Sequence, residues 1–293
     1  MKPAPFAYAD PRTVEDAVAL LAEHGVDVKA IAGGQSLMPL LNMRLARPSV
    51  VVDLNRVEGL DYIRQEDGWL TIGAMTRQRA IERSDLVQRA QPLLHAATRC
   101  IAHPQIRNRG TIGGSLAHAD PAAEYPAVAL LLDAELRIAG PSGARTVPAR
   151  DFFVTYLTTA LEPEELVTGV RVPVLPERTG WSFLEVSRRH GDFALAGAAA
   201  TLTLSAGGEC ASARIVLFGV APTPVRAEAA EALLTGERPG AVLFEEAGRL
   251  AGEGLDEALS DVHASAEYRR HLARVLTRRA LTEADSRAKG ATS

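Results

Sequence analysis

Cysteine is scarce in this sequence, which limits the metal chemistry that the chain can support by itself. Only two of the 293 residues are cysteine, Cys100 and Cys210. An iron–sulfur cluster takes about four thiolates, and neither cysteine belongs to a zinc-binding pattern. His118-Ala119-Asp120 lacks a third ligand at a suitable spacing. We therefore predict that this chain has no metal site and that both cysteines are small buried side chains. Any metal chemistry would then take place on a partner chain.

Long apolar runs and an excess of positive charge are also missing. The apolar stretches 127–132 and 194–204 are shorter than the ~20 residues of a membrane span. A net charge of −4 does not favour a nucleic-acid surface. Residues 1–6 lack the charged-then-apolar pattern of a secretory signal. We expect a cytoplasmic protein with no membrane span and no nucleic-acid partner.

The common nucleotide and hydrolase signatures are absent as well. Neither the G-x-G-x-x-G pattern nor a Gly-Lys-Ser/Thr phosphate loop occurs, and there is no G-x-S-x-G nucleophile turn. Two glycine pairs stand out instead. Gly113-Gly114 lies between Thr111 and Ser115. Glycines can adopt positive φ and let a ligand approach the backbone closely. In such a turn successive N–H groups can converge on an anion, and the hydroxyl of Thr111 or Ser115 can serve as a further donor. An ordinary tight turn between strands is the alternative.

The other pair, Gly33-Gly34, follows an apolar strand predicted over residues 28–32. Ser36 is placed to cap a helix over residues 37–45, with Pro39 tolerated in the first turn. A strand, a glycine turn and a helix N-terminus together form a receptor for phosphate. Our hypothesis is that the two glycine turns hold a diphosphate from opposite sides.

Alternating strand and helix patterns predict a small α/β unit over the first ~55 residues, in which Thr13 caps a helix that Gly25 ends. The region that follows has a different pattern of short strands and helices. Asp120-Pro121 is predicted to open a helix. A Pro/Gly cluster at 173–180 marks a boundary. A C-terminal unit over 176–284 then contains a three-stranded antiparallel sheet and three helices, the last over 266–280, and 285–293 form a loose tail.

These motifs resemble the FAD-binding medium subunit of the xanthine dehydrogenase/carbon monoxide dehydrogenase (molybdenum hydroxylase) family. The likeness covers nearly the whole chain and includes residues 187–194, 268–270 and 278–281. It implies an α+β fold with a bipartite FAD-binding domain (1–175), made of a small α/β subdomain (1–57) and a larger α+β subdomain (58–175), followed by a C-terminal flavoprotein domain (176–284). The FAD diphosphate would be held by the two glycine turns. The residues that it implies as cofactor contacts in these turns are Ala32, Gly33, Gly34, Gln35, Ser36, Leu37, Thr111, Ile112, Gly113, Gly114 and Ser115.

Further contacts follow from the same resemblance. Glu124 stands where the family has a carboxylate that binds the cofactor, although a favourable charge in a first helical turn is the other explanation. Ile101 stands where relatives can have an aromatic over the flavin. Leu166 is expected on the adenine side, and Asp192 and Phe193 near the isoalloxazine ring, with core or turn roles as the alternative. Leu184 replaces a lysine of some relatives. No catalytic residue is expected on this chain, because the flavin ring carries the redox chemistry.

The resemblance also implies a relay function. A small [2Fe-2S] iron–sulfur subunit would supply electrons, the flavin would pass them to an external acceptor, and a large molybdopterin-binding subunit would hydroxylate the substrate. The assembly would be a heterotrimer or a dimer of heterotrimers. Two other functions stay open: a stand-alone FAD-dependent oxidoreductase, which would need an acid/base group beside the flavin, and a non-enzymatic nucleotide-binding or scaffold module.

Overall fold

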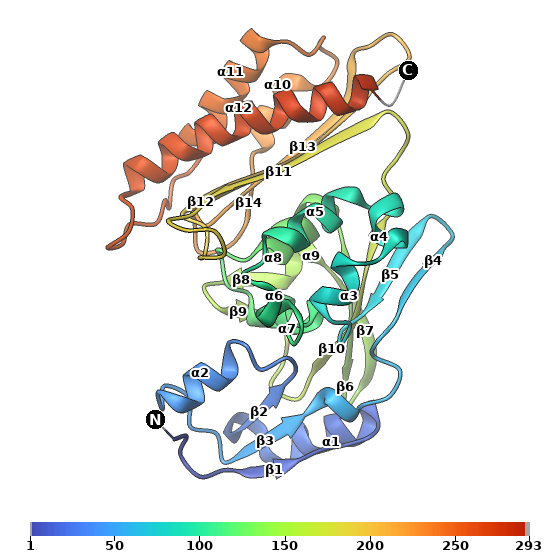
Figure 1. The fold of residues 1–293 in the computed structure, drawn as a ribbon, viewed down its shortest axis with the longest axis vertical. Coiled ribbons are helices and arrows are strands. Elements are labelled where there is room, and N and C mark those ends of the chain that lie inside the picture. Colours follow the sequence, from blue (N-terminus) through green and yellow to red (C-terminus); the bar gives the residue numbers. More distant parts are fainter. Residues whose placement is uncertain (1, 291–293) are drawn as a thin grey trace.

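The computed structural model describes residues 2–290 as three units stacked along the long axis of the molecule. In Figure 1 the N-terminal unit lies at the bottom in blue, the middle unit follows in cyan and green, and the C-terminal unit lies at the top in yellow to red. Within the described residues, no helix is both long and apolar enough to cross a membrane.

The N-terminal unit is a parallel three-stranded sheet of order β1-β3-β2. Helix α1 packs on it through Ala17, Val18 and Leu21, which are buried as the 3.6-residue spacing requires. The predicted caps of α1 are confirmed: the Thr13 hydroxyl accepts from the Asp16 N–H at 3.0 Å, and Gly25 follows the last helical residue. The elements are β1 (Ala7–Ala9), α1 (Val14–His24), β2 (Val28–Ile31), α2 (Leu37–Asn42) and β3 (Val50–Asp53).

The middle unit combines a five-stranded antiparallel sheet of order β4-β5-β10-β6-β7 with short helices. One helix begins later than expected. The Asp120 carboxylate accepts from the Ala122 N–H at 2.9 Å, which forms a separate turn, so α8 begins only at Glu124. The strands of this sheet are β4 (Ile63–Glu66), β5 (Trp69–Gly73), β6 (Glu135–Gly140), β7 (Gly143–Pro148) and β10 (Leu166–Pro173). A separate two-stranded sheet contains β8 (Phe153–Thr155) and β9 (Thr158–Thr159). The helices are α3 (Gln78–Glu82), α4 (Asp85–Ala90), α5 (Pro92–Cys100), α6 (Pro104–Arg107), α7 (Ile112–His118), α8 (Glu124–Leu131) and α9 (Ala149–Phe152).

The C-terminal unit has a sheet with both faces covered. Along β12, Ala198 and Ala200 belong to the core beneath the helices, whereas Ala199 belongs to the core shared with the middle unit. This explains why the strand is apolar at nearly every position. The elements are β11 (Thr179–Val186), β12 (Ala196–Leu204), β13 (Cys210–Phe218), β14 (Val225–Arg226), α10 (Glu228–Leu234), α11 (Ala241–Glu253) and α12 (Ala266–Gly290). The short strand β14 makes the sheet four-stranded rather than three-stranded.

The last helix is longer than predicted. It continues to Gly290, so residues 285–290 are helical rather than loose, and residues 291–293 lie outside the described part of the chain. Ala284 and Ala288 are fully buried and continue the apolar spacing of Leu276 and Ala280. A Cβ on Gly180 would overlap the Ala284 carbonyl, so the backbones of β11 and α12 are in direct contact. The end of α12 is therefore held by packing on the sheet.

Candidate functional site

The first glycine pair forms the predicted turn at the carboxyl end of β2. Gly34 has a φ of +71°, which favours glycine. The backbone N–H groups of Gly33, Gly34, Gln35 and Ser36 donate to no group of the described residues. The Gln35 side chain braces the turn by donating to the Gly33 carbonyl at 2.8 Å. Four successive N–H groups without a protein acceptor are unusual in a folded chain, and such a set is suited to binding an anion.

Ser36 does not act as the predicted side-chain cap. Its backbone is already in the right-handed helical region (φ −100°, ψ −44°), and its hydroxyl makes no capping hydrogen bond. Helix α2 is also shorter than expected and ends at Asn42. The Ser36 hydroxyl therefore remains available at the same edge as the free N–H groups.

The second glycine pair is not a positive-φ turn, and this prediction is wrong. Gly113 and Gly114 lie in the first turn of α7, where the Gly113 N–H donates to the Ala74 carbonyl at 2.9 Å. The Gly114 N–H donates to the Thr111 hydroxyl at 3.0 Å, so Thr111 is the N-cap. The absence of side chains serves packing instead. A Cβ on Gly113 would lie 2.5 Å from the Ala74 Cβ, and one on Gly114 would lie 3.3 Å from the Ala32 Cβ.

The two glycine segments are in contact, although about 80 residues separate them in the sequence. Besides the approach of Gly114 to Ala32, a Cβ on Gly33 would overlap the Arg109 carbonyl. Asn55 ties the segments together, because its amide donates to the Ala32 carbonyl at 3.0 Å and accepts from Arg77. Arg77 also donates to the Arg109 carbonyl. The proposed halves of one binding site therefore belong to one connected structure.

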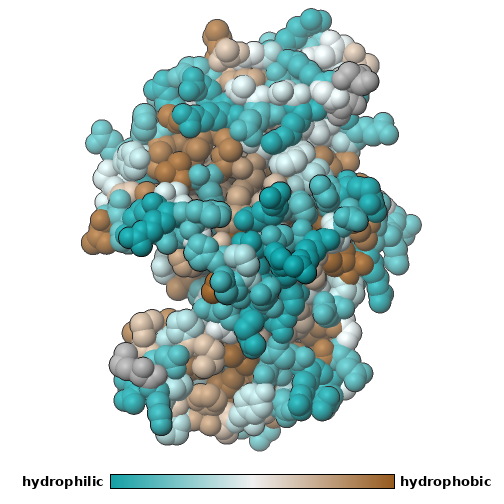
Figure 2. Space-filling view, viewed as in Figure 1, coloured by the Kyte–Doolittle hydropathy of each residue, from teal (hydrophilic) through white to brown (hydrophobic). Residues whose placement is uncertain are grey.

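A cleft of about 620 Å³ opens beside the first turn. Figure 2 shows the surface indented between the N-terminal and middle units. The size of the cleft is typical of small-molecule and cofactor sites. Its walls are largely apolar, with a few polar groups at the strand ends. The lining residues are Phe6, Tyr8, Ile31, Ala32, Gly33, Gly34, Gln35, Met38, Pro39, Asn42, Val51, Asp53, Asn55, Ile106 and Arg109.

Asp53 contributes a fixed negative charge to this cleft. Burial opposes its ionisation, but hydrogen bonds from the Asn55 backbone, the Tyr8 hydroxyl and the Asn55 amide outweigh burial and lower the pKa of Asp53. The Tyr8 hydroxyl donates to Asp53 at 2.7 Å. The carboxylate is thus ionised and immobilised at the end of β3.

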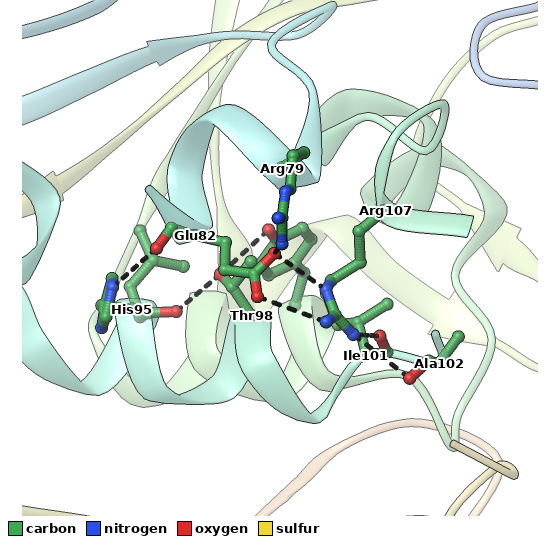
Figure 3. A network of polar contacts seen from close by, with 9 residues as sticks. Arg79, Glu82, His95, Thr98, Ile101, Ala102 and Arg107 are labelled. Carbon is green, nitrogen blue, oxygen red and sulfur yellow. Dashed lines mark hydrogen bonds and ion pairs between the residues drawn. The ribbon is translucent and has the colours of Figure 1, made fainter. Parts of the chain in front are cut away.

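Ile101 lies in a bend that a buried arginine holds. Arg107 is 6% exposed and donates to the carbonyls of Ile101 at 2.6 Å and Ala102 at 3.2 Å (Figure 3). The same guanidinium binds both carboxylate oxygens of Glu82, at 3.1 and 3.2 Å. Ala102 takes a φ of +40°, a strained value for alanine. The side chain of Ile101 is 7% exposed and packs in the core of the middle unit.

Glu124 is the first residue of α8 and lies beside this bend. Burial raises the pKa of Glu124 to about 8, and repulsion from Glu185 and Asp120 adds to this effect. Burial also raises the pKa of Glu185 to about 7. Cys100, the last residue of α5, is near both carboxylates, and burial together with their charges raises its thiol pKa to about 12. The surroundings of these three acidic groups therefore favour their neutral forms.

The remaining predicted contacts lie in two places. Gly191 (φ +87°) is so close to the His103 ring that a Cβ there would meet it, so the loop with Asp192 lies against the Ile101–His103 bend. Phe193 in this loop is 65% exposed. Leu166 is 5% exposed at the start of β10 and packs in the core of the N-terminal unit.

Several residues of the site had not been predicted, among them Asn55, Arg77 and Glu185. Asn55 carried a usable signal, because ligands of α/β units gather at the carboxyl ends of parallel strands and it follows the buried strand β3. Arg77 and Glu185 carry no comparable signal in the sequence, since their partners come from distant elements.

Comparison with known proteins agrees with this geometry. Residues 4–175 match the family described as the FAD binding domain in molybdopterin dehydrogenase, and residues 181–284 match the CO dehydrogenase flavoprotein C-terminal domain. The chain belongs to the FAD-binding medium subunits of the molybdenum hydroxylases. The predicted family, the α+β fold and FAD as the cofactor are thereby confirmed.

Members of this family align with the chain over nearly the full length of both sequences. The 6-hydroxypseudooxynicotine dehydrogenase complex subunit alpha of Paenarthrobacter nicotinovorans is 46% identical, over 99% of this chain and 97% of the relative. The carbon monoxide dehydrogenase medium chain of Afipia carboxidovorans is 43% identical, over 99% of this chain and all of the relative. Among solved structures, carbon monoxide dehydrogenase from Hydrogenophaga pseudoflava aligns with a TM-score of 0.95 at 41% identity, covering 98% of this chain and 99% of the other.

Proposed function

We propose that this chain carries FAD as the medium subunit of a molybdenum hydroxylase and relays electrons from an iron–sulfur subunit to an external acceptor. The observation that carries the proposal is the row of four free N–H groups at the first glycine turn, which opens on the cleft between two units. Such a donor set suits the diphosphate of a dinucleotide. When bound, FAD supplies the redox chemistry, and the chain supplies position and electrostatics.

The first segment provides most of the proposed diphosphate donors. We assign this role to Gly33, Gly34, Gln35 and Ser36, flanked by Ala32 and Leu37. In the second segment the N–H groups of Gly113 and Gly114 are already used within the protein. Thr111 and Ile112 therefore position this segment, while the Ser115 hydroxyl, which makes no hydrogen bond with the described residues, serves as a donor.

The isoalloxazine ring is proposed to lie toward the junction with the C-terminal unit. Glu124, Ile101, Asp192 and Phe193 would then contact it, and Gly191 supports this by bringing its loop onto the Ile101–His103 bend. The burial of Leu166 suits an apolar contact at the adenine end. We further propose domain boundaries at residues 57, 175 and 284 and a cytoplasmic location.

The partners proposed are a small [2Fe-2S] subunit and a large molybdopterin-binding subunit, in a heterotrimer or a dimer of heterotrimers. Relatives of this chain are described as medium chains or as subunits of complexes. A separate iron–sulfur subunit fits this sequence, because its two distant cysteines cannot hold an iron–sulfur cluster.

Rapid mixing tests the relay. The purified iron–sulfur subunit is reduced, freed of excess reductant and mixed with the FAD-loaded full chain while flavin absorbance is followed. We expect flavin bleaching with the reduced subunit and none with the oxidised one. Absence of bleaching would contradict the relay. Turnover of an organic substrate by the FAD-loaded chain alone would instead favour a stand-alone oxidoreductase.

A further inference from the structure

Arg269 is more deeply buried than any other charged residue in the part of the chain that the structure describes. It is the fourth residue of α12, which runs along the sheet of the C-terminal unit (Figure 1), and it is 3% exposed. A charge at such a depth is costly unless hydrogen bonds and an ion pair satisfy it. Residues 268–270 belong to the segments that resemble the family, but none of the proposed cofactor contacts lies among them.

The guanidinium of Arg269 binds three segments that are distant in the sequence. Its Nη1 atom donates to the carbonyls of Leu195 and Gly219, the latter at 2.5 Å. Its Nη2 atom donates to the Asp261 carboxylate at 2.7 Å. Leu195 directly follows the loop 187–194, Gly219 directly follows β13, and Asp261 precedes α12. Arginine suits this place because its planar fork offers several donors in fixed directions, whereas lysine is a single point charge.

Asp261 fixes the position of this charge. Its second carboxylate oxygen accepts from the backbone N–H groups of His263 at 2.8 Å and Ala264 at 3.0 Å. Burial opposes the ionisation of Asp261, but these hydrogen bonds and the Arg269 guanidinium outweigh burial and lower the pKa of Asp261. The ion pair is therefore anchored to the backbone before α12.

The Leu195 and Gly219 carbonyls lie at the base of the loop. The Leu195 N–H donates to the Val186 carbonyl at 2.8 Å, which closes the loop. A Cβ on Gly219 would lie 2.8 Å from the Ala194 carbonyl, so the end of β13 is in direct contact with the end of the loop. Arg269 therefore holds the loop at its closing residue and at the backbone on which the loop rests.

Gly219 also connects Arg269 to the middle unit. Its N–H donates to the Pro121 carbonyl at 2.7 Å. Pro121 lies in the turn that precedes α8, whose first residue is Glu124. Through Leu195 and Gly219, Arg269 is therefore linked to both backbone segments that are proposed to meet the isoalloxazine ring.

We propose that Arg269 is a positioning residue of the cofactor site. It holds the loop 187–194 and the turn before α8 at a fixed spacing, so that Asp192, Phe193 and Glu124 meet the flavin ring without rearrangement. A site that is held in place in this way avoids the entropy cost of ordering a loop when the ligand binds. The role at the ring rests on the proposed function, whereas the support of the loop is a property of this chain alone.

Three substitutions separate this role from a general loss of stability. Arg269→Met keeps most of the side-chain length and removes the charge and the hydrogen bonds. Arg269→Lys keeps the charge and loses the planar fork. Arg270→Met is the matched control, because Arg270 also donates to two backbone carbonyls, those of Leu255 at 3.0 Å and Asp256 at 3.3 Å. These two carbonyls lie between α11 and α12, away from the loop.

Hydrogen exchange of the full chain without FAD tests the support of the loop. The amides to follow are the N–H groups of Leu195 and Gly219, because both are hydrogen-bonded at the base of the loop. In Arg269→Met they should exchange at least ~10-fold faster, since a hydrogen bond from a charged donor shifts the opening equilibrium by about this factor. Arg269→Lys should give intermediate rates, and Arg270→Met should leave both rates unchanged.

Unchanged exchange of both amides in Arg269→Met would overturn the support of the loop. If Arg269→Met did not fold, the same comparison between Arg269→Lys and Arg270→Met would decide it. Equal acceleration in Arg269→Met and Arg270→Met would also overturn it, because that result indicates a general loss of stability.

The role at the ring is tested on chains loaded with one FAD each. In Arg269→Met the visible absorption bands and the midpoint potential of the flavin should shift toward those of free FAD. Arg269→Lys should restore part of this shift, and Arg270→Met should keep the values of the unmodified chain. Identical spectra and potentials in Arg269→Met and the unmodified chain would overturn the role at the ring. If no chain bound FAD, the proposed function would fail, while hydrogen exchange would still decide whether Arg269 supports the loop.

Discussion

In the two glycine pairs, only Gly34 uses the conformational freedom of its residue type. Its φ of +71° forms the turn in which four successive N–H groups have no acceptor in the described residues and which lines the cleft, whereas Gly113 and Gly114 lie in a right-handed helix. Glycine is required for two different reasons: Gly34 needs a positive φ, whereas Gly113 and Gly114 leave no room for a side chain. Substitutions at these positions should therefore fail in different ways.

Replacement of Gly34 by valine should remove FAD binding with little effect on the other units. A β-branched residue resists positive φ, and its Cβ would lie 3.1 Å from Ile31 and 3.3 Å from Met38. Loss of two charge-assisted hydrogen bonds of ~1.5 kcal/mol each corresponds to an affinity reduced at least ~100-fold. FAD titration of the full chain followed by flavin fluorescence measures this.

Gly208→Val is the control for backbone strain. Gly208 has a φ of +84° with open space around it, in a turn far from the cleft. It should cost similar stability and leave FAD affinity unchanged. Equal FAD affinities in the two variants would refute the role of Gly34.

Stability should fall as pH rises, because of Glu124 and Glu185. Their raised pKa values, to about 8 and about 7, mean that the folded chain holds protons that the unfolded chain has already released. The contribution is complete below the ordinary glutamate pKa of 4.5 and is lost as pH rises through 8.

We expect the unfolding free energy to fall by ~2 kcal/mol over this pH range. This is less than the value obtained by converting both pKa shifts at about 1.36 kcal/mol per unit, because solvent reaches part of both glutamates. Urea denaturation at several pH values measures it on the FAD-free chain. Glu185→Gln should reduce the loss to roughly half of that value. An undiminished loss in this variant would show that other groups cause it.

At the scale of elements, the bend between α5 and α6 depends on one arginine. Arg107 supplies donors to two carbonyls and to Glu82, whose pKa is lowered because the hydrogen bonds from Arg107 and Arg79 outweigh its burial. Arg107→Met should cost ~3 kcal/mol of unfolding free energy, because it leaves two carbonyls without their donor and the largely buried Glu82 carboxylate without its main partner. Chemical denaturation measures this cost.

Arg79→Met is the matched comparison. Arg79 binds the same carboxylate at 2.7 Å, but its side chain is 30% exposed. Its loss should cost ~1 kcal/mol or less. Equal costs for the two variants would mean that Arg107 does not hold the bend.

The elements also show where sequence patterns suffice. The caps of α1 and the strands β2 and β3 follow from local signals, namely a hydroxyl before a helix, a glycine after it and β-branched runs. The second glycine pair could not be interpreted locally, because glycine serves both positive φ and close packing, and Ala74 on a distant segment decides between them. The end of α12 was missed because charged residues alternate with Ala284 and Ala288, although these keep the helical spacing.

At the scale of the whole molecule, the site is assembled from all three units. The free N–H groups come from the N-terminal unit, the glycine helix α7 from the middle unit, and Glu185 from the C-terminal unit. Family resemblance was sufficient to predict FAD as the cofactor, and the contacts that it implies stay predictions. The electrostatic effect of Glu185 on Glu124 was not predictable, because these residues, about 60 positions apart, influence each other only once the sheet of the C-terminal unit packs against α5 and α8.

The identity and amount of the small molecule that heat releases from the purified full chain test the central claim most directly. Chromatography with mass detection identifies the molecule, and its absorbance gives the amount. The account predicts FAD at a ratio close to one per chain, and its loss in Gly34→Val with retention in Gly208→Val. FMN, another nucleotide, or no bound molecule after incubation with FAD would contradict it.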